Sequence, residues 1–196
     1  MLSSIHPLGE RVKGNRYQVT AGAYVVGSTL GGTALGALAA VAGLAVHVLV
    51  PTGAALAIAA IVALGGAVAD RTGLRLPCWR RQVDERWLDV YRGTVYGAGF
   101  GAQLGFGLVT IVTSASTYVA VAMAVLIGGP VSALVIGTTF GTVRGLVLLS
   151  GRRITGPESL RHFHRRLAEQ APAFDRATSV TMVLAGLALA GIAVAV

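Results

Sequence analysis

Polar side chains that could recognise a solute lie inside a long uncharged segment of the chain. Gln103 is the one amide in segment 94–127, and Thr110 and Thr117 follow at intervals of seven residues. Because seven residues make about two helical turns, a continuous helix would carry all three side chains on one face. The candidate passage-lining residues are Gln103, Thr110, Thr113, Ser114 and Thr117. In the alternative interpretation, Gln103 ties two helices together and the hydroxyls bond their own backbone.

Two charged residues form a candidate gate, and they lie at matching positions in the first and second halves of the chain. Asp70 follows one apolar segment, and Arg144 lies near the end of another. An Asp70–Arg144 ion pair would close the cytoplasmic side of a passage. The simpler alternative is that both charges reach the headgroup region of the membrane.

Other chemistry has little support in the sequence. His162 and His164 have only Glu158 as a nearby third ligand, and the single cysteine, Cys78, excludes an intrachain disulfide. No spacing typical of a catalytic, nucleotide-binding or metal site is present. We therefore expect no enzyme activity, no cofactor and no metal. The net charge is +8, and the basic residues lie beside apolar runs. This arrangement favours binding of anionic lipid over binding of nucleic acid.

The elements that carry these residues are predicted to be membrane-spanning helices. The chain has 196 residues, of which only 12% are charged, and residues 19–49 and 93–143 contain no Asp, Glu, Lys or Arg. Uncharged apolar runs of about 18 residues or more are typical of membrane spans. The predicted spans are 19–49, 53–69, 94–127, 131–150 and 178–196. We expect an all-α integral membrane protein with about five transmembrane helices.

The basic residues predict the topology. The short turns between paired spans carry no Lys or Arg, and positively charged segments stay in the cytoplasm. We expect a multi-pass protein of the cell membrane with its N-terminus in the cytoplasm and its C-terminus outside. The predicted parts are a cytoplasmic segment 1–18, a hairpin 19–69, a basic linker 70–92, a second hairpin 93–150, a basic linker 151–177 and a last helix 178–196.

Several features describe how the spans would be arranged. The halves read as a parallel 2+2 duplication followed by one C-terminal helix, and each linker contains an amphipathic helix for the cytoplasmic surface.

The first and third spans are too long for a bilayer core of about 30 Å. They either project beyond it or break, with Gly31-Gly32 and residues 113–117 as the places to break. Glycines four residues apart, such as Gly97, Gly101 and Gly105, predict close helix packing.

These observations favour a small transporter or channel for a small uncharged or anionic solute, since no carboxylate was found within the spans for coupling to cations. The alternative is a non-catalytic membrane subunit that anchors or organises a partner complex. Expected partners are membrane lipids and either a second copy of the chain or a partner membrane subunit.

Overall fold

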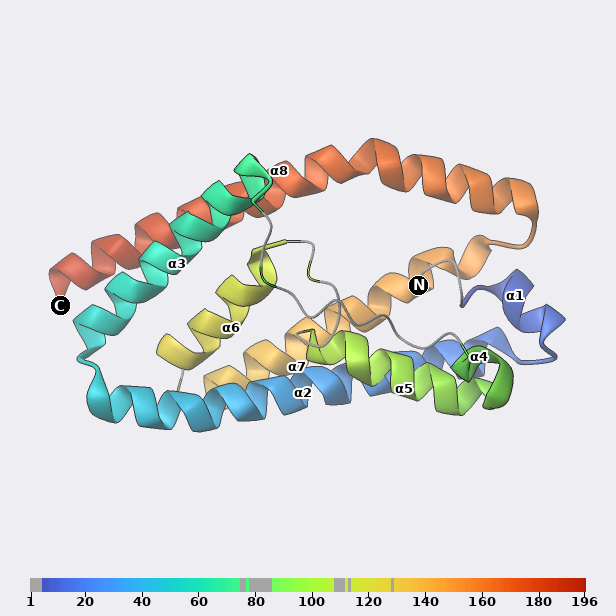
Figure 1. The fold of residues 1–196 in the computed structure, drawn as a ribbon, viewed down its shortest axis with the longest axis horizontal. Coiled ribbons are helices and arrows are strands. Elements are labelled where there is room, and N and C mark those ends of the chain that lie inside the picture. The colour runs from blue at the N-terminus through green and yellow to red at the C-terminus, as the bar shows by residue number, and fades with distance from the viewer. Residues whose placement is uncertain (1–4, 75–76, 78–85, 108–111, 113, 128) are drawn as a thin grey trace. The chain divides into compact units, whose positions relative to one another are not determined.

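The computed structural model is all-α, as predicted. It describes residues 5–74, 77, 86–107, 112, 114–127 and 129–196, and 86% of the described residues are helical with none in a strand. Figure 1 traces the helices along the chain. In chain order they are α1 (Pro7–Val12), α2 (Tyr17–Leu49), α3 (Thr52–Thr72), α4 (Trp87–Val90), α5 (Gly93–Phe106), α6 (Ser116–Leu126), α7 (Pro130–Val147), the 3₁₀ helix η1 (Leu148–Arg153) and α8 (Pro157–Ala195).

Four helical segments in the described part of the chain are long and apolar enough to cross a membrane. They are Tyr17–Leu49, Thr52–Thr72, Pro130–Arg153 and Pro157–Ala195. The first, second and fourth predicted spans are thus helical. The third is divided between the shorter helices α5 and α6. The fold is that of an all-α membrane protein.

Of the two alternatives for the first long span, the break at Gly31-Gly32 does not occur, because α2 is one helix of 33 residues. At 1.5 Å per residue it is about 50 Å long. A Cβ on Gly31 would collide with the Ala102 carbonyl of α5. These glycines therefore admit a neighbouring helix and do not interrupt their own. The first long span is continuous and the third is interrupted, a difference between the halves that the predicted duplication does not anticipate.

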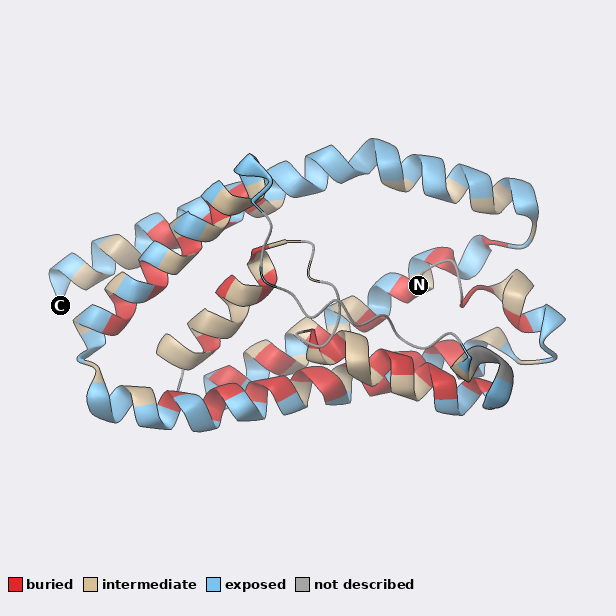
Figure 2. Cartoon of the chain, viewed as in Figure 1, coloured by how far each residue is buried: buried red, intermediate tan, exposed pale blue. Residues whose placement is uncertain are grey.

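The second linker and the last span form a single helix. α8 runs for 39 residues through Pro172, although the basic, polar composition ends and the apolar run begins near residue 178. Figure 2 shows the first half of α8 as almost entirely exposed. Of the first linker, α4 is described, whereas Cys78 and most of residues 75–85 lie outside the described residues.

The chain forms two compact units, and α2, α7 and α8 each contribute to both. Unit 1 comprises Met1–Thr33, Arg80–Thr110 and Thr138–Ala171. Unit 2 comprises Ala34–Trp79, Ile111–Gly137 and Pro172–Val196.

In unit 1, glycines bring α5 and α7 against the backbone of α2. A Cβ on Gly101 or Gly105 would collide with the carbonyl of Tyr24 or Ser28, and one on Gly141 would also collide with that of Ser28. Such close approach replaces the hydrophobic effect as the source of helix association in lipid.

Hydroxyl groups cross between α2 and α7 within unit 1. The Ser28 hydroxyl donates to the Gly141 carbonyl at 2.6 Å. Thr29 pairs with Thr142 at 3.1 Å and Thr33 with Thr138 at 2.9 Å. These bonds fix the register of the two helices, at roughly 0.6–2 kcal/mol each within a membrane.

In unit 2, small residues of α3 pack against α6 and α8. The buried cluster consists of Ala63 and Ala67 from α3, Val119 from α6 and Met182 from α8. A Cβ on Gly66 would lie 2.8 Å from the Val119 side chain. α3 therefore holds α6 in place through close contact of short side chains.

Candidate functional site at the interrupted third span

The third predicted span stops being helical at Gly107. α5 ends at Phe106, and Gly107 has φ +75°, a conformation that favours glycine. A Cβ there would also lie 2.9 Å from the Phe140 ring and 3.1 Å from Nη1 of Arg144. Both the backbone conformation and the available space therefore require glycine at this position.

The second half-helix, α6, has a carboxylate at its N-terminus. The backbone N–H of Ala115 donates to Oδ1 of Asp70 at 2.7 Å, and the Ser114 hydroxyl donates to Oδ2 at 2.7 Å. Ser114 in turn accepts from the backbone N–H of Ser116 at 3.1 Å. A negative charge stabilises the positive end of a helix dipole. Asp70 thus accepts a hydrogen bond from a backbone N–H at the start of α6, within unit 2. The sequence did not predict this role.

Arg144 lies in the last turn of α7, within the candidate span Pro130–Arg153. It comes 14 residues after Pro130, which is about 21 Å along the helix axis. Its guanidinium carbon lies 5.1 Å from the centre of the Phe140 ring, a cation–π contact. Its Nη1 atom is buried and has no hydrogen-bond partner among the described residues. Such a charged donor is costly within a membrane and is usually paired.

The predicted passage-lining residues have different environments. Gln103 is half-buried on α5, and the structure records no hydrogen bond of its side chain to a described residue. Thr117 is buried on α6, and Ser114 bonds to Asp70. Thr110 and Thr113 lie outside the described residues. Because α5 ends before α6 begins, the seven-residue spacing does not place Gln103 and Thr117 on one helix face. Their lining of a passage stays a prediction, as does the Asp70–Arg144 gate.

A buried carboxylate in unit 1 was missed by the sequence analysis. Glu10 of α1 is fully buried. It accepts from the Thr20 hydroxyl of α2 at 2.8 Å, and the Tyr96 hydroxyl of α5 lies 2.5 Å from each of its oxygens. Asn15 donates to Tyr96 at 3.2 Å, and the Lys13 ammonium lies 5.6 Å from the centre of the Tyr96 ring.

The start of α1, which carries Glu10, could be predicted from the neighbouring residues. His6 precedes Pro7 and accepts from the backbone N–H of Gly9 at 3.2 Å, so the helix start at Pro7 follows a known pattern. That pattern predicts a short helix containing Glu10. The side chain's burial against Tyr96, 86 positions away, has no local signal.

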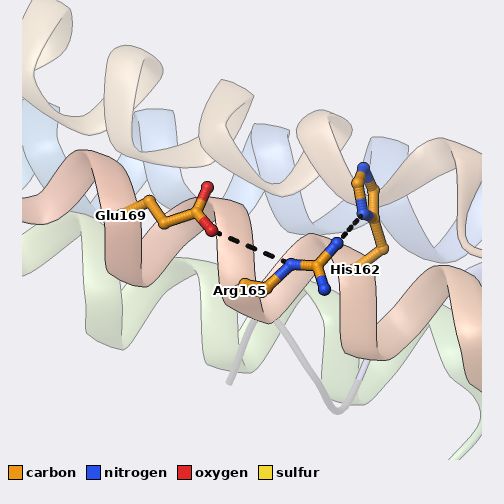
Figure 3. A network of polar contacts seen from close by, with 3 residues as sticks. All are labelled: His162, Arg165 and Glu169. Atoms are coloured by element: carbon orange, nitrogen blue, oxygen red, sulfur yellow. Dashed lines mark hydrogen bonds and ion pairs between the residues drawn. The ribbon is translucent and has the colours of Figure 1, made fainter.

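The histidines of α8 lie in an exposed polar network. Nη2 of Arg165 lies 3.1 Å from Nδ1 of His162, and its Nε lies 3.8 Å from Glu169 (Figure 3). His164 instead contacts the Leu160 carbonyl at 3.0 Å. Within the described part of the chain, no group of three His, Cys, Asp or Glu side chains is placed to hold a metal ion.

Comparison with known proteins gives no relative: no protein family, no curated protein and no solved structure matches this chain.

Proposed function

We propose that this protein is a small transporter or channel for a small anionic solute, with Arg144 as the residue that binds the anion. The observation that carries this proposal is the buried Nη1 atom of Arg144, which has no partner among the described residues. A passing anion would supply the missing acceptor and charge. A solute without an acceptor would leave the guanidinium unsatisfied.

The interruption of the third span supports a transport function. Non-helical backbone at membrane depth is tolerated where it is buried in protein or lines a water-filled cavity. Discontinuous helices are also a recurring feature of transporter binding sites. In unit 1 the end of α5 at Gly107 adjoins Arg144, and Phe140 lies against the guanidinium. The end of the helix thus lies beside a guanidinium whose Nη1 atom has no hydrogen-bond partner in the described part of the chain.

Arg144→Gln is expected to lower anion flux about tenfold or more in liposomes, because a charge-assisted hydrogen bond contributes about 1.5–3 kcal/mol. Purified protein would be reconstituted, and chloride, nitrate and phosphate fluxes compared with glycerol flux. Arg144→Lys keeps the charge and should retain part of the activity. Arg176→Gln, an exposed position on α8, makes the same charge change and should match the wild type.

Unchanged anion flux in a stable Arg144→Gln protein would contradict the role of Arg144. Glycerol flux without anion flux would instead favour an uncharged solute. Gln103→Leu belongs in the same experiment. If Gln103 lines the passage, this variant remains stable and alters flux; if it ties helices together, the variant loses stability.

The proposed topology places the N-terminus in the cytoplasm, residues 70–92 and 151–177 on the same side, and the C-terminus outside. The distribution of arginine supports it. A reporter fused after Gly151 should give a cytoplasmic signal, and one fused after Val196 an external signal. A cytoplasmic signal from the Val196 fusion would contradict the five-span arrangement.

A second candidate function is that of a non-catalytic subunit of a membrane complex. The long exposed first half of α8, with its basic residues, favours this candidate as a surface for another protein. Purification in mild detergent separates the two functions. A second polypeptide in fixed stoichiometry, together with no flux from the isolated chain, would favour the subunit.

A further inference from the structure

A pocket of about 410 Å³ lies in unit 1 beside the N-terminal helix. α1 and the start of α2 form most of it, and Thr155, just before α8, completes it. Pro7 and Leu8 supply apolar lining, and Arg11, Asn15, Tyr17 and Thr155 supply polar lining. The volume falls within the range of small-ligand sites, roughly 300–1,000 Å³.

The walls of the pocket are fixed by buried contacts. Glu10 holds α1 against α2 and α5 through Thr20 and Tyr96. The Tyr17 hydroxyl donates to the Leu148 carbonyl at 3.3 Å and so joins α2 to η1. Ile154, next to Thr155, is 2% exposed. These contacts join α1, α2, α5 and η1 around the pocket.

The one charged residue that lines the pocket in the described part of the chain is basic. This residue is Arg11, and two further arginines, Arg152 and Arg153, precede the lining residue Thr155 by three and two positions. Glu10 is the only carboxylate in α1, and its oxygens are buried in hydrogen bonds. Among the described residues, the Arg11 guanidinium makes no ion pair and the Thr155 hydroxyl no hydrogen bond. Both are available as donors to an anion.

The pocket lies where apolar spans give way to polar chain. Tyr17 is the first residue of one candidate span, and Arg152 and Arg153 end another. Lipid headgroups occupy this depth, and basic pockets beside membrane helices suit anionic headgroups. We infer that the pocket binds a phosphate group, supplied by the headgroup of an anionic phospholipid, with Arg11 and Thr155 as its donors.

The inference is tested by lipid binding to the full chain in detergent, followed by native mass spectrometry and thermal unfolding. Phosphatidylglycerol should be retained at one equivalent and should raise the melting temperature, and phosphatidylcholine should do neither. Arg11→Gln should weaken phosphatidylglycerol binding about tenfold or more, since it removes a charge-assisted bond. Thr155→Val should weaken it about fivefold, the effect of one neutral hydrogen bond.

Arg176→Gln is the matched control and should bind phosphatidylglycerol as the wild type does. Since Arg11 and Thr155 are exposed, lipid-free melting temperatures should be unchanged in all three variants. Inorganic phosphate that binds in an Arg11-dependent manner and displaces the lipid would support the phosphate site and identify a free anion as its source. Equal weakening by Arg11→Gln and Arg176→Gln, or no binding of either probe, would overturn the inference.

Discussion

Gly101→Leu is expected to destabilise the protein by about 3 kcal/mol or more, since it overpacks a helix contact that has no free space. A Cβ at this position would collide with the Tyr24 carbonyl and lie 2.9 Å from the Ser28 backbone nitrogen. These are backbone atoms of α2, so no side chain can rotate away. The change corresponds to a melting temperature lower by roughly 6–12 °C for a chain of this size, measured in detergent.

The structure offers matched controls for this substitution. Apart from its chain neighbours and the adjacent backbone of its own helix, a Cβ on Gly22 of α2 or Gly65 of α3 would meet no described atom within 4 Å. Leucine at either position adds the same side chain to a helix without separating two helices, and should cost less than about 1 kcal/mol. Gly141→Leu should resemble Gly101→Leu. If both unfold at the temperature of the Gly22 and Gly65 variants, the glycine faces do not determine stability.

Tyr96→Phe is expected to destabilise the protein by about 1.5–3 kcal/mol, because it removes a donor from a fully buried carboxylate. The Tyr96 hydroxyl lies 2.5 Å from each oxygen of Glu10, and after the change the Thr20 hydroxyl is the one side-chain donor left to Glu10 among the described residues. The effect would be measured by thermal unfolding in detergent. Tyr91→Phe is the control: the Tyr91 ring is exposed, and the structure records no hydrogen bond of its hydroxyl among the described residues.

A double-mutant cycle shows whether the effect depends on Glu10. In a Glu10→Leu background the buried charge is absent, so adding Tyr96→Phe should cost less than about 1 kcal/mol. Equal costs of Tyr96→Phe in both backgrounds would mean that the tyrosine acts through packing alone. A cost no larger than that of Tyr91→Phe would mean that the carboxylate does not need this donor.

The positions of most spans could be predicted because an uncharged apolar run is a local property of the sequence. Three predicted spans agree with observed helices to within three residues at each end: 19–49 with α2, 53–69 with α3 and 131–150 with α7. When a continuous apolar run of that length enters lipid, its backbone N–H and C=O groups must form hydrogen bonds within the segment, and a helix provides them. The sequence alone therefore determined the all-α fold class.

Helix continuity was decided by tertiary contacts. Gly31-Gly32 looked like a break from sequence, but α5 and α7 pack closely against these two glycines and α2 remains one helix. The third span ends at Gly107, where the chain takes a positive φ beside Phe140 and Arg144. Both segments are rich in glycine, and their local composition does not distinguish them.

The candidate site was predicted only in part, because its residues depend on partners that are distant in sequence. Asp70 and Arg144 were singled out as rare charges near apolar spans, yet Asp70 bonds to Ser114 and Ala115, 44 and 45 positions away. Glu10 lies in the predicted cytoplasmic segment 1–18, whose basic and polar composition does not indicate that this side chain is buried. Hydrogen bonds from Thr20 and Tyr96 compensate much of the cost of burying its charge. Composition determines which segments enter the membrane, whereas only the packing of α1, α2 and α5 brings together the donors that allow a carboxylate to be buried.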